Sequence, residues 1–284
     1  MGIRLGFHVS IAGGVANSVD NAKKIGCTAF QIFSRNPRGW TAKPLTPDDV
    51  NLFKTRLASS GIDKRDIIVH MPYLPNLSGP DGEFYEKSVD TLIEEMHRCN
   101  ELDIRYLVIH LGSHMGKGQA SGIKQLVKAI ETAIDKTRED TPTVLLENNA
   151  GQKNSVGATF EELRTILDRL GDPKRFGVCL DTCHLFASGY DLRKESDVHK
   201  TLEKFDNVVG LKNLKFIHLN DSKGSLCSNL DRHEHIGLGM IGSEGLAAFL
   251  NHKSIRDLPV IMETPIDERR GDEENLKAVL RMIK

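Results

Sequence analysis

The chain has 284 residues, of which 38 are Lys or Arg and 39 are Asp or Glu, so its formal net charge is −1. Its content of 39% hydrophobic and 27% charged residues is typical of a folded globular protein and excludes an intrinsically disordered chain. The neutral balance also excludes a generic polycationic coat for nucleic acids, but not an enzyme that gains positive charge from metal ions.

Eight short apolar runs recur along the chain, and each has the length of a buried strand. They are Arg4–Val9, Thr28–Phe33, Asp66–His70, Tyr106–His110, Thr143–Glu147, Phe176–Asp181, Lys215–His218 and Pro259–Glu263. Amphipathic segments between them predict helices. The clearest are a helix capped by Thr46 and stopped by Gly61, one that follows the capping box Thr159–Glu162, and Phe84–Leu102, Ile123–Arg138, Ser243–Leu250 and Glu273–Ile283.

This alternation has no break in composition, and it predicts an α/β protein with a single (β/α)8 TIM-barrel domain over residues 1–284. A doubly wound open sheet is the alternative, because short apolar runs are easily miscounted. The longer loops follow strands, on the C-terminal face where barrel enzymes carry their active sites. These loops are Arg35–Pro44, Met71–Gly82, Ser113–Gly122, Phe186–His199 and Asn220–Gly242.

The chain shows no targeting segment. The residues after Met1 lack the apolar core of a signal peptide, and no apolar run approaches the ~18 residues of a membrane span. Its five cysteines form no Cys-x-x-Cys pair, so we expect reduced thiols and a cytoplasmic protein without a membrane partner.

Six consecutive predicted strands end on a residue type that binds metals. The six residues are His70, His110, Glu147, Asp181, His218 and Glu263. One such residue alone is more often a structural residue with hydrogen-bond partners, but a barrel brings all its strand ends to one mouth. We therefore expect these six side chains to point into one volume.

Two local clusters extend this set. His184 follows Asp181 by three residues, and Asp231 and His233 lie two apart on one side of an extended chain. His235 continues the alternation, so spacing alone does not choose between it and His233. The nine candidates are too many for one tetrahedral zinc, and a mixture of imidazole and carboxylate favours Zn²⁺ or Mn²⁺. Three dications add six charges and would bring −1 to +5, which would attract a polyanion.

The motifs around these residues closely resemble those of the endonuclease IV family of apurinic/apyrimidinic (AP) endonucleases, also called AP endonuclease family 2 or zinc-dependent deoxyribonuclease IV. The shared blocks run nearly end to end, and the most specific are Leu180–His184, His218–Lys223 and Asp231–Gly237. The others are Gly6–Ser10, Ala12–Gly14, Phe33–Trp40, His70–Leu77, His110–His114, Leu146–Asn148 and Met262–Thr264.

The resemblance implies three zinc ions per chain, with manganese as an alternative at one site. Carried over by position, His70, His110 and bridging Glu147 hold the first ion. Glu147, Asp181, His218 and Glu263 hold the second, and His184, Asp231 and His233 hold the third. The resemblance thus selects His233 over His235. We also expect His8 and His114, near the mouth, to form hydrogen bonds to ligands rather than to bind metal.

The resemblance also implies how DNA is bound. Members of the family bend the duplex, turn out the abasic nucleotide and fill the gap through the minor groove with loop side chains, which match Arg38, Tyr73 and Leu74 here. The alternative is that Tyr73 and Leu74 only cover the rim of the barrel. Pro37, Pro72 and Pro75 stiffen the same loops, and we attach no function to them.

The implied reaction is hydrolysis of the phosphodiester 5′ to an AP site, leaving a 3′-hydroxyl and a 5′-deoxyribose phosphate, in base excision repair. A metal-bound hydroxide is the expected nucleophile, with Glu263 and Glu147 as catalytic residues. Removal of 3′-phosphates and other 3′-blocking groups is expected by the same chemistry. The partner is then damaged double-stranded DNA in the cytoplasmic nucleoid, with no obligate protein partner.

Two other functions remain open. A metal-dependent sugar isomerase or epimerase on a similar barrel would use Glu147, Asp181, His218 and Glu263 but would leave the other candidates without a role. A non-catalytic reader of abasic DNA would use zinc for stability only.

Overall fold

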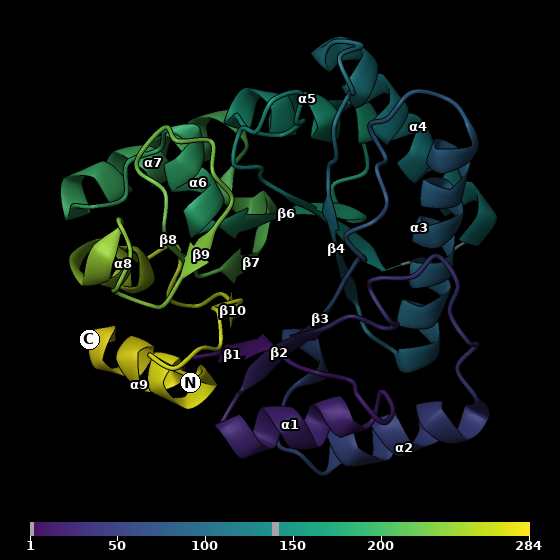
Figure 1. Ribbon diagram of the computed structural model, residues 1–284, viewed down its shortest axis with the longest axis horizontal. Helices are drawn as coiled ribbons and strands as arrows, with labels where there is room; N and C mark the ends of the chain where they lie inside the picture. The colour runs from purple at the N-terminus through teal and green to yellow at the C-terminus, as the bar shows by residue number, and fades with distance from the viewer. Residues whose placement is uncertain (1–2, 138–141) are drawn as a thin grey trace.

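The computed structural model describes residues 3–137 and 142–284, and within these ranges eight parallel strands form a closed barrel (Figure 1). The order around the ring is β1-β10-β7-β6-β5-β4-β3-β2. The strands are β1 Leu5–His8, β2 Ala29–Ile32, β3 Ile67–His70, β4 Tyr106–His110, β5 Thr143–Glu147, β6 Phe176–Asp181, β7 Leu214–His218 and β10 Val260–Met262. The prediction of a TIM barrel is confirmed, and an open sheet is excluded.

Helices surround the barrel and cover the outer face of its strands (Figure 1). They are α1 Asn17–Ile25, α2 Pro47–Ala58, α3 Glu83–Leu102, α4 Gln119–Thr137, α5 Phe160–Leu170, α6 Thr182–Ser188, α7 Glu195–Val208, α8 Gly242–Asn251 and α9 Asp272–Met282, with short 3₁₀ turns at Lys64–Asp66 and Leu211–Asn213. A separate two-stranded antiparallel sheet, β8 Asp221–Ser222 and β9 His233–Glu234, lies in the connection from β7 to α8. None of the helices in the described ranges has the length and apolar character needed to cross a bilayer.

Local chemistry fixes the helix starts that the sequence indicates. The hydroxyl of Thr46 accepts from the backbone N–H of Asp49, whose carboxylate accepts from the N–H of Thr46, so α2 begins with a complete capping box. The hydroxyl of Thr159 caps α5 in the same way, but the carboxylate of Glu162 turns instead to the N–H groups of residues 157 and 158.

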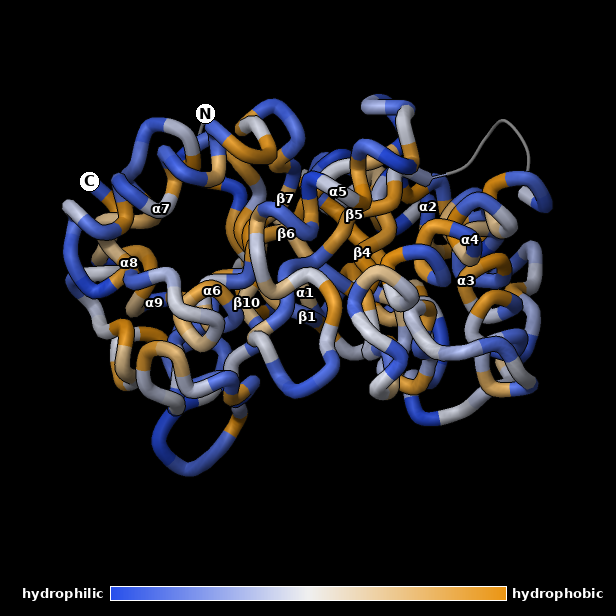
Figure 2. Tube along the Cα trace, turned by 90° about the horizontal axis from the view of Figure 1, so that it is seen from above, coloured by the Kyte–Doolittle hydropathy of each residue, from blue (hydrophilic) through white to orange (hydrophobic). Residues whose placement is uncertain are grey.

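The barrel interior is filled on its N-terminal side, and this determines where a site can lie. Seven strands each contribute one buried side chain to an inner apolar cluster, namely Ala29, Ile68, Val108, Leu145, Cys179, Phe216 and Ile261. The eighth strand has Gly6, where a Cβ would lie 1.7 Å from the carbonyl oxygen of Ala29. The hydropathy colouring shows the same apolar strands inside a hydrophilic periphery (Figure 2). Polar chemistry is thereby confined to the C-terminal mouth.

Several predicted boundaries differ from those observed. The segment predicted as a loop over Phe186–His199 contains the start of α7, and α6 begins directly after Asp181 where a loop was expected. The eighth strand ends at Met262, so Glu263 lies one residue beyond it. The predicted end of a helix at Arg138 lies outside the described residues, and α4 is described to Thr137.

Candidate metal centre

The C-terminal ends of the strands bring the nine predicted ligands together. Five of them are the last residues of β3 to β7, and Glu263 follows β10 directly. The nine form three groups, the first two of which share Glu147, and within each group the ligand atoms lie within 4.8 Å of one another. The groups are His70, His110 and Glu147; Glu147, Asp181, His218 and Glu263; and His184, Asp231 and His233.

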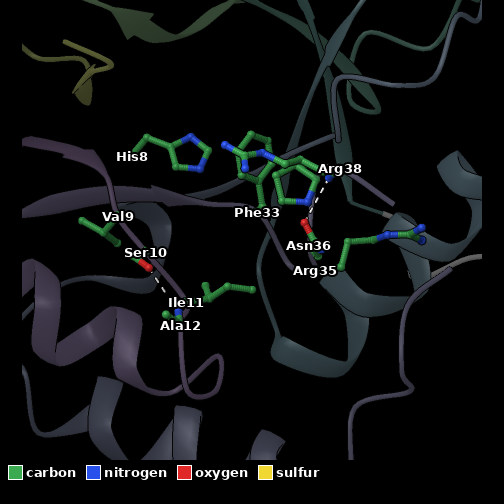
Figure 3. Close-up of a pocket in the computed structure, with 10 residues that line it drawn as sticks. His8, Val9, Ser10, Ile11, Ala12, Phe33, Arg35, Asn36 and Arg38 are labelled. Atoms are coloured by element: carbon green, nitrogen blue, oxygen red, sulfur yellow. Dashed lines mark hydrogen bonds between the residues drawn. The ribbon is translucent and has the colours of Figure 1, made fainter. Parts of the chain in front are cut away.

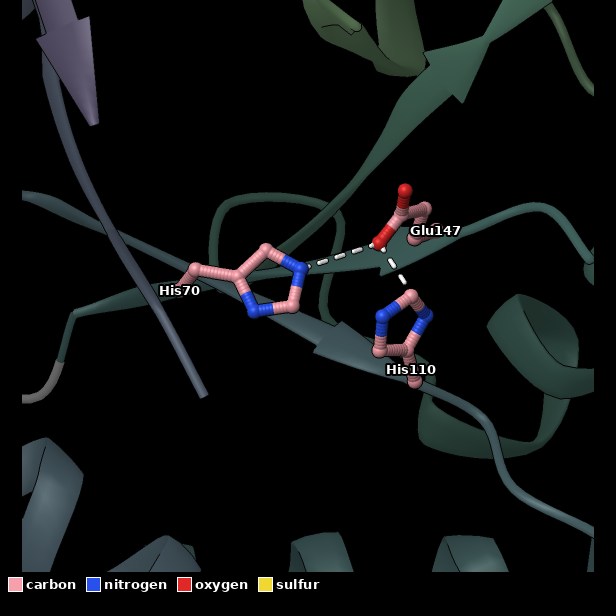
Figure 4. Close-up of side chains that lie close together, drawn as sticks. All are labelled: His70, His110 and Glu147. Carbon is pink, nitrogen blue, oxygen red and sulfur yellow. Dashed lines mark hydrogen bonds and ion pairs between the residues drawn. The ribbon is translucent and has the colours of Figure 1, made fainter. Parts of the chain in front are cut away.

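Glu147 is the centre of the arrangement. Its Oε2 atom lies 3.2 Å from Nε2 of His70 and 3.3 Å from Nδ1 of His110 (Figure 4), while Oε1 lies 2.9 Å from Nδ1 of His218. Its side chain is fully buried, and each oxygen faces a different group. A carboxylate in this position is suited to bridge two cations.

The third group lies to one side, where α6 and the β7–α8 connection meet. Nε2 of His184 lies 3.1 Å from Oδ1 of Asp231, and Nε2 of His233 lies 3.6 Å from the same oxygen and 3.6 Å from Oδ2 of Asp181. Asp181 therefore lies between the second and third groups.

Hydrogen bonds to the far ring nitrogen fix the tautomer of four of the histidines. Nδ1 of His70, His184 and His233 donates to a carbonyl oxygen of Met71, Asn148 and Glu263, respectively. Nε2 of His218 donates to the amide oxygen of Gln31 at 2.8 Å. A carbonyl oxygen only accepts, so in the neutral form of each ring the other nitrogen carries the lone pair, and this nitrogen faces the centre of the site.

The same reasoning distinguishes His233 from His235. Nε2 of His235 donates to Asp267 at 2.9 Å, and its Nδ1 accepts from the amide of Asn275 at 3.0 Å. Both ring nitrogens of His235 are therefore used within the protein, whereas Nε2 of His233 is directed toward the third group. The geometry favours the choice that the family resemblance implies.

These residues fit divalent cations. The Nε2 atoms of His184 and His233 are buried and face carboxylate oxygens of Asp231 and Asp181 at 3.1–3.6 Å without a well-aligned hydrogen bond. The four carboxylates interact with imidazoles and side-chain amides rather than with lysine or arginine of the described ranges. Buried nitrogens without a well-aligned hydrogen bond and grouped carboxylates are costly unless a cation is shared among them. Imidazole with carboxylate is a donor set for Zn²⁺ or Mn²⁺.

The electrostatics of the cation-free chain agree with this interpretation. Burial alone would raise the pKa of Glu147, but the neighbouring His110 and His218 outweigh it and hold this pKa well below its usual range. Burial alone would lower the pKa of His184, but the carboxylates of Asp181 and Asp231 raise it to about 10. Burial raises the pKa of the Cys183 thiol, which lies near Asp181 and His233, and this disfavours a thiolate ligand.

Three side-chain amides hold the ligands in place, and sequence reasoning did not assign them this role. Gln31 donates to Glu263 at 2.6 Å and to Nδ1 of His8 at 2.8 Å. Asn220 donates to Oδ2 of Asp181 at 2.6 Å and accepts from the N–H of Glu263. Asn148 accepts from the N–H of Asp181. The sequence signal that could have identified such a residue is a polar side chain inside an apolar strand, as with Gln31 in β2.

The two additional histidines occupy different positions. His8 ends β1 and reaches Glu263 through Gln31, with Nδ1 lying 3.7 Å from Oε1 of Glu263. His114 accepts from the N–H of Gly118 within its own loop and belongs to none of the three groups. His8 is therefore placed as a partner of a ligand, whereas His114 organises the loop after β4.

The predicted DNA-contacting side chains lie at the mouth. Tyr73 and Leu74 are 63% and 37% exposed, and the Tyr73 ring lies 6.1 Å from that of His70. Arg38 borders a pocket of about 820 Å³ next to His8 and Phe33 (Figure 3). These positions suit contacts with a substrate that reaches the metal centre.

A buried ion cluster holds the loop that carries Arg38. Arg35 donates to the carbonyl oxygens of Gly39 and Trp40, and Arg98 donates to those of Ser34 and Lys43. Glu95, from α3, is fully buried between the two guanidinium groups and accepts from the hydroxyl of Ser34. Trp40 packs edge-on against Phe84, which places it on the rim.

We expect Glu95→Ala to lower the free energy of unfolding by about 3–5 kcal/mol, because it removes the buried carboxylate next to Arg35 and Arg98 and leaves Arg35 with the half-exposed Glu94 as its counter-charge. Chemical denaturation measures this change. Glu94→Ala is the matched control, since Glu94 contacts Arg35 from a side chain that is 37% exposed, and it should cost no more than about 1 kcal/mol. Equal losses in the two variants would contradict a structural role for the buried cluster.

Comparison with known proteins agrees with the fold and the motifs. A family model described as a xylose isomerase-like TIM barrel matches residues 19–284. A protein of Nitrosopumilus maritimus (strain SCM1), named "Probable endonuclease 4", is 54% identical over 97% of this chain and 98% of its own length. The crystal structure of endonuclease IV from Thermus thermophilus matches with a TM-score of 0.87 and 37% identity over 98% of both chains.

A more distant likeness concerns the fold alone. The crystal structure of a D-tagatose 3-epimerase-like protein has a TM-score of 0.73 at 19% identity, over 98% of this chain and 96% of that one. The nearer relatives share this chain's sequence over almost its whole length, together with the barrel. On this evidence, the chain belongs to the endonuclease IV family.

Proposed function

We propose that this protein is a metal-dependent DNA-repair endonuclease that hydrolyses the phosphodiester 5′ to AP sites. The observation that carries the proposal is the convergence of nine imidazole and carboxylate side chains in three adjacent groups at one barrel mouth. An epimerase would need only the group around Glu147 and Glu263, and would leave the third group of His184, Asp231 and His233 without a use.

The residues that would hold three ions follow the three groups. Glu147 joins the first two groups, and Asp181 lies between the second and the third. When bound, such ions polarise a phosphodiester and lower the pKa of water toward ~7, which supplies a nucleophile at neutral pH. Zinc fits this donor set, with manganese as the alternative at one site.

Glu263 is the carboxylate best placed to handle a proton. Its side chain is 15% exposed at the mouth, whereas that of Glu147 is fully buried. Gln31 and Asn220 hold it from behind, so its position is fixed before substrate arrives. In the proposed reaction Glu263 takes the proton of the attacking water, whose oxygen bonds to phosphorus. The bond from phosphorus to the upstream 3′-oxygen breaks and this oxygen takes a proton from solvent water, which leaves a 3′-hydroxyl and a 5′-deoxyribose phosphate.

The proposal also covers the processing of 3′ ends, the cellular compartment and the DNA partner. A phosphate or other blocking group on a 3′-oxygen presents the same phosphorus–oxygen bond to the site, so we include 3′-phosphatase and 3′-phosphodiesterase activity. All five cysteines are free, which agrees with action in a reducing, cytoplasmic compartment on nucleoid DNA. We regard residues 1–284 as one catalytic domain, with damaged duplex DNA as its partner.

The test is incision of a duplex that carries one tetrahydrofuran AP analogue, with an undamaged duplex as control. We expect a nick 5′ to the analogue that is lost on prolonged chelation and restored by zinc. Metal analysis should give three ions per chain. Binding without a nick in the zinc-loaded protein would instead support a reader of abasic DNA. One or two ions with no action on DNA would support an epimerase.

We expect Tyr73→Ala to raise KM for the abasic duplex roughly ten- to hundredfold, because an exposed ring that stacks on a base contributes about 1–3 kcal/mol. Steady-state kinetics with and without the substitution measures this change, and the metal content should stay the same. Leu52→Ala, which removes an exposed apolar side chain on α2 away from the mouth, is the control and should leave KM unchanged. Equal KM values in the two variants would favour a simple rim cover.

A further inference from the structure

Asp221, the first residue of β8, has a fully buried carboxylate. Both of its oxygens accept hydrogen bonds from backbone N–H groups. Oδ1 accepts from Ser222 at 2.8 Å and from Ile241 at 3.0 Å, and Oδ2 accepts from Gly237 and Gly239, both at 3.0 Å. The N–H of residue 242 lies 3.3 Å from Oδ2. No lysine, arginine or histidine of the described ranges forms an ion pair with it. Five donors on one carboxylate indicate a specific structural task.

That task concerns the connection from β7 to α8. Asp221 stands where the connection leaves the barrel, and its donors at 237–242 stand where the chain returns to α8. Between these points, β9 pairs with β8, and Ser222 lies opposite His233. Asp231 and His233, two of the three residues of the third group, are both on this connection. The carboxylate therefore closes the base of the segment that supplies these two ligands.

The surroundings of Asp221 are specific for a small, negatively charged acceptor. A Cβ on Gly239 would lie 2.5 Å from Oδ1 of Asp221, so the returning chain approaches the carboxylate as closely as glycine permits. An asparagine at 221 would turn an NH₂ donor toward N–H donors and leave them unsatisfied.

We propose that Asp221 is a positioning residue for the third metal ion, acting through the backbone of the segment that carries Asp231 and His233. The inference rests on the proposed three-ion centre. The ligands of the first two groups stand at the ends of the barrel strands or directly after them, and this segment supplies none of them. An ion pair of Glu234 with Arg269 and a hydrogen bond from His235 to Asp267 hold the opposite side of the segment. Loss of Asp221 should therefore weaken the third site rather than abolish the fold.

The experiment compares zinc content after dialysis, and zinc titrations, for the full-length wild-type chain, Asp221→Asn and Asp66→Asn. Asp66 is the matched control, because it is a buried carboxylate paired with Arg4 in front of β3, at the opposite end of the barrel. We expect three ions in the wild type and in Asp66→Asn, but two in Asp221→Asn. The third ion should bind again at about 10–100-fold higher zinc. Circular dichroism and thermal unfolding monitor the fold.

Gly239→Ala places a methyl group against the Asp221 carboxylate and so perturbs the same contact from the returning chain. It provides the test of the inference if Asp221→Asn does not fold. Selective loss of one ion in either folded variant supports the inference. Three ions held with native affinity in the folded variants, or equal weakening of all three, would overturn it while leaving the proposed function intact. A wild-type chain with fewer than three ions would overturn both the three-ion centre and this inference.

Discussion

Glu147→Gln is expected to lower the rate of incision at an AP site by about three orders of magnitude or more, and to reduce the bound zinc to the ion of the third group. The two oxygens of Glu147 face imidazoles of different groups, so in the proposed centre two ions would depend on this one side chain. Each ion contributes several kcal/mol to stabilising the transition state. About 1.4 kcal/mol is a factor of ten in rate, so losing two ions removes most of the catalysis.

Glutamine keeps the shape of the side chain, so the effect reports charge and coordination rather than a cavity. Metal analysis and incision kinetics measure it together. Glu83→Gln is the control, since this glutamate at the start of α3 is 82% exposed and pairs with Lys87, and it should change neither quantity. If Glu147→Gln kept three ions and a native rate, the bridging role would be wrong, and with it the assignment of the first two ions.

The positions of most ligands followed from the sequence because two simple rules act together. Apolar runs mark buried strands, and a closed barrel gathers the ends of its strands at one mouth. His70, His110 and His218 each end such a run, and each is the last residue of its strand in the structure. Histidines and carboxylates that are far apart in the sequence could therefore be predicted to lie in one site.

The positioning groups could not be predicted in this way. Gln31 and Asn220 hold ligands through amides whose residue types are common on any polar surface. The choice between His233 and His235 depends on Asp267 and Asn275, which lie more than 30 residues further along the chain. Such contacts are set by tertiary packing, and spacing along the chain carries no information about them.

Three helices, α1, α6 and α7, were not named from the sequence, and for α6 and α7 the reason is local. α6 begins at once after β6, with Asp181 as its N-cap, and six of its seven residues are buried. It therefore shows no alternation of polar and apolar positions by which a helix is recognised. α7 carries an amphipathic pattern, but its first turn, with Glu195 and Asp197, was included in a predicted loop of polar residues. The consequence was small, because His184 still reaches the mouth from the first turn of α6.

Glu263→Gln separates proton transfer from metal binding at the same centre. We expect kcat for AP-site incision to fall by about 10²–10⁴-fold, the usual contribution of a positioned base, with KM little changed. The amide oxygen of glutamine still offers a ligand atom, and Gln31 and Asn220 remain to hold the side chain. The zinc content should therefore stay at three ions per chain, unlike that of Glu147→Gln.

The measurement is single-turnover incision combined with metal analysis on the same preparation, which keeps substrate binding and product release out of the rate. Glu268→Gln is the matched control, because this exposed glutamate lies on the same loop after β10 and faces solvent. A loss of rate in Glu263→Gln that added zinc reversed would show that the carboxylate acts as a ligand alone. A loss of rate at full zinc occupancy assigns to Glu263 the proton of the attacking water, because its carboxylate is the partly exposed one at the mouth while that of Glu147 is closed off by three imidazoles.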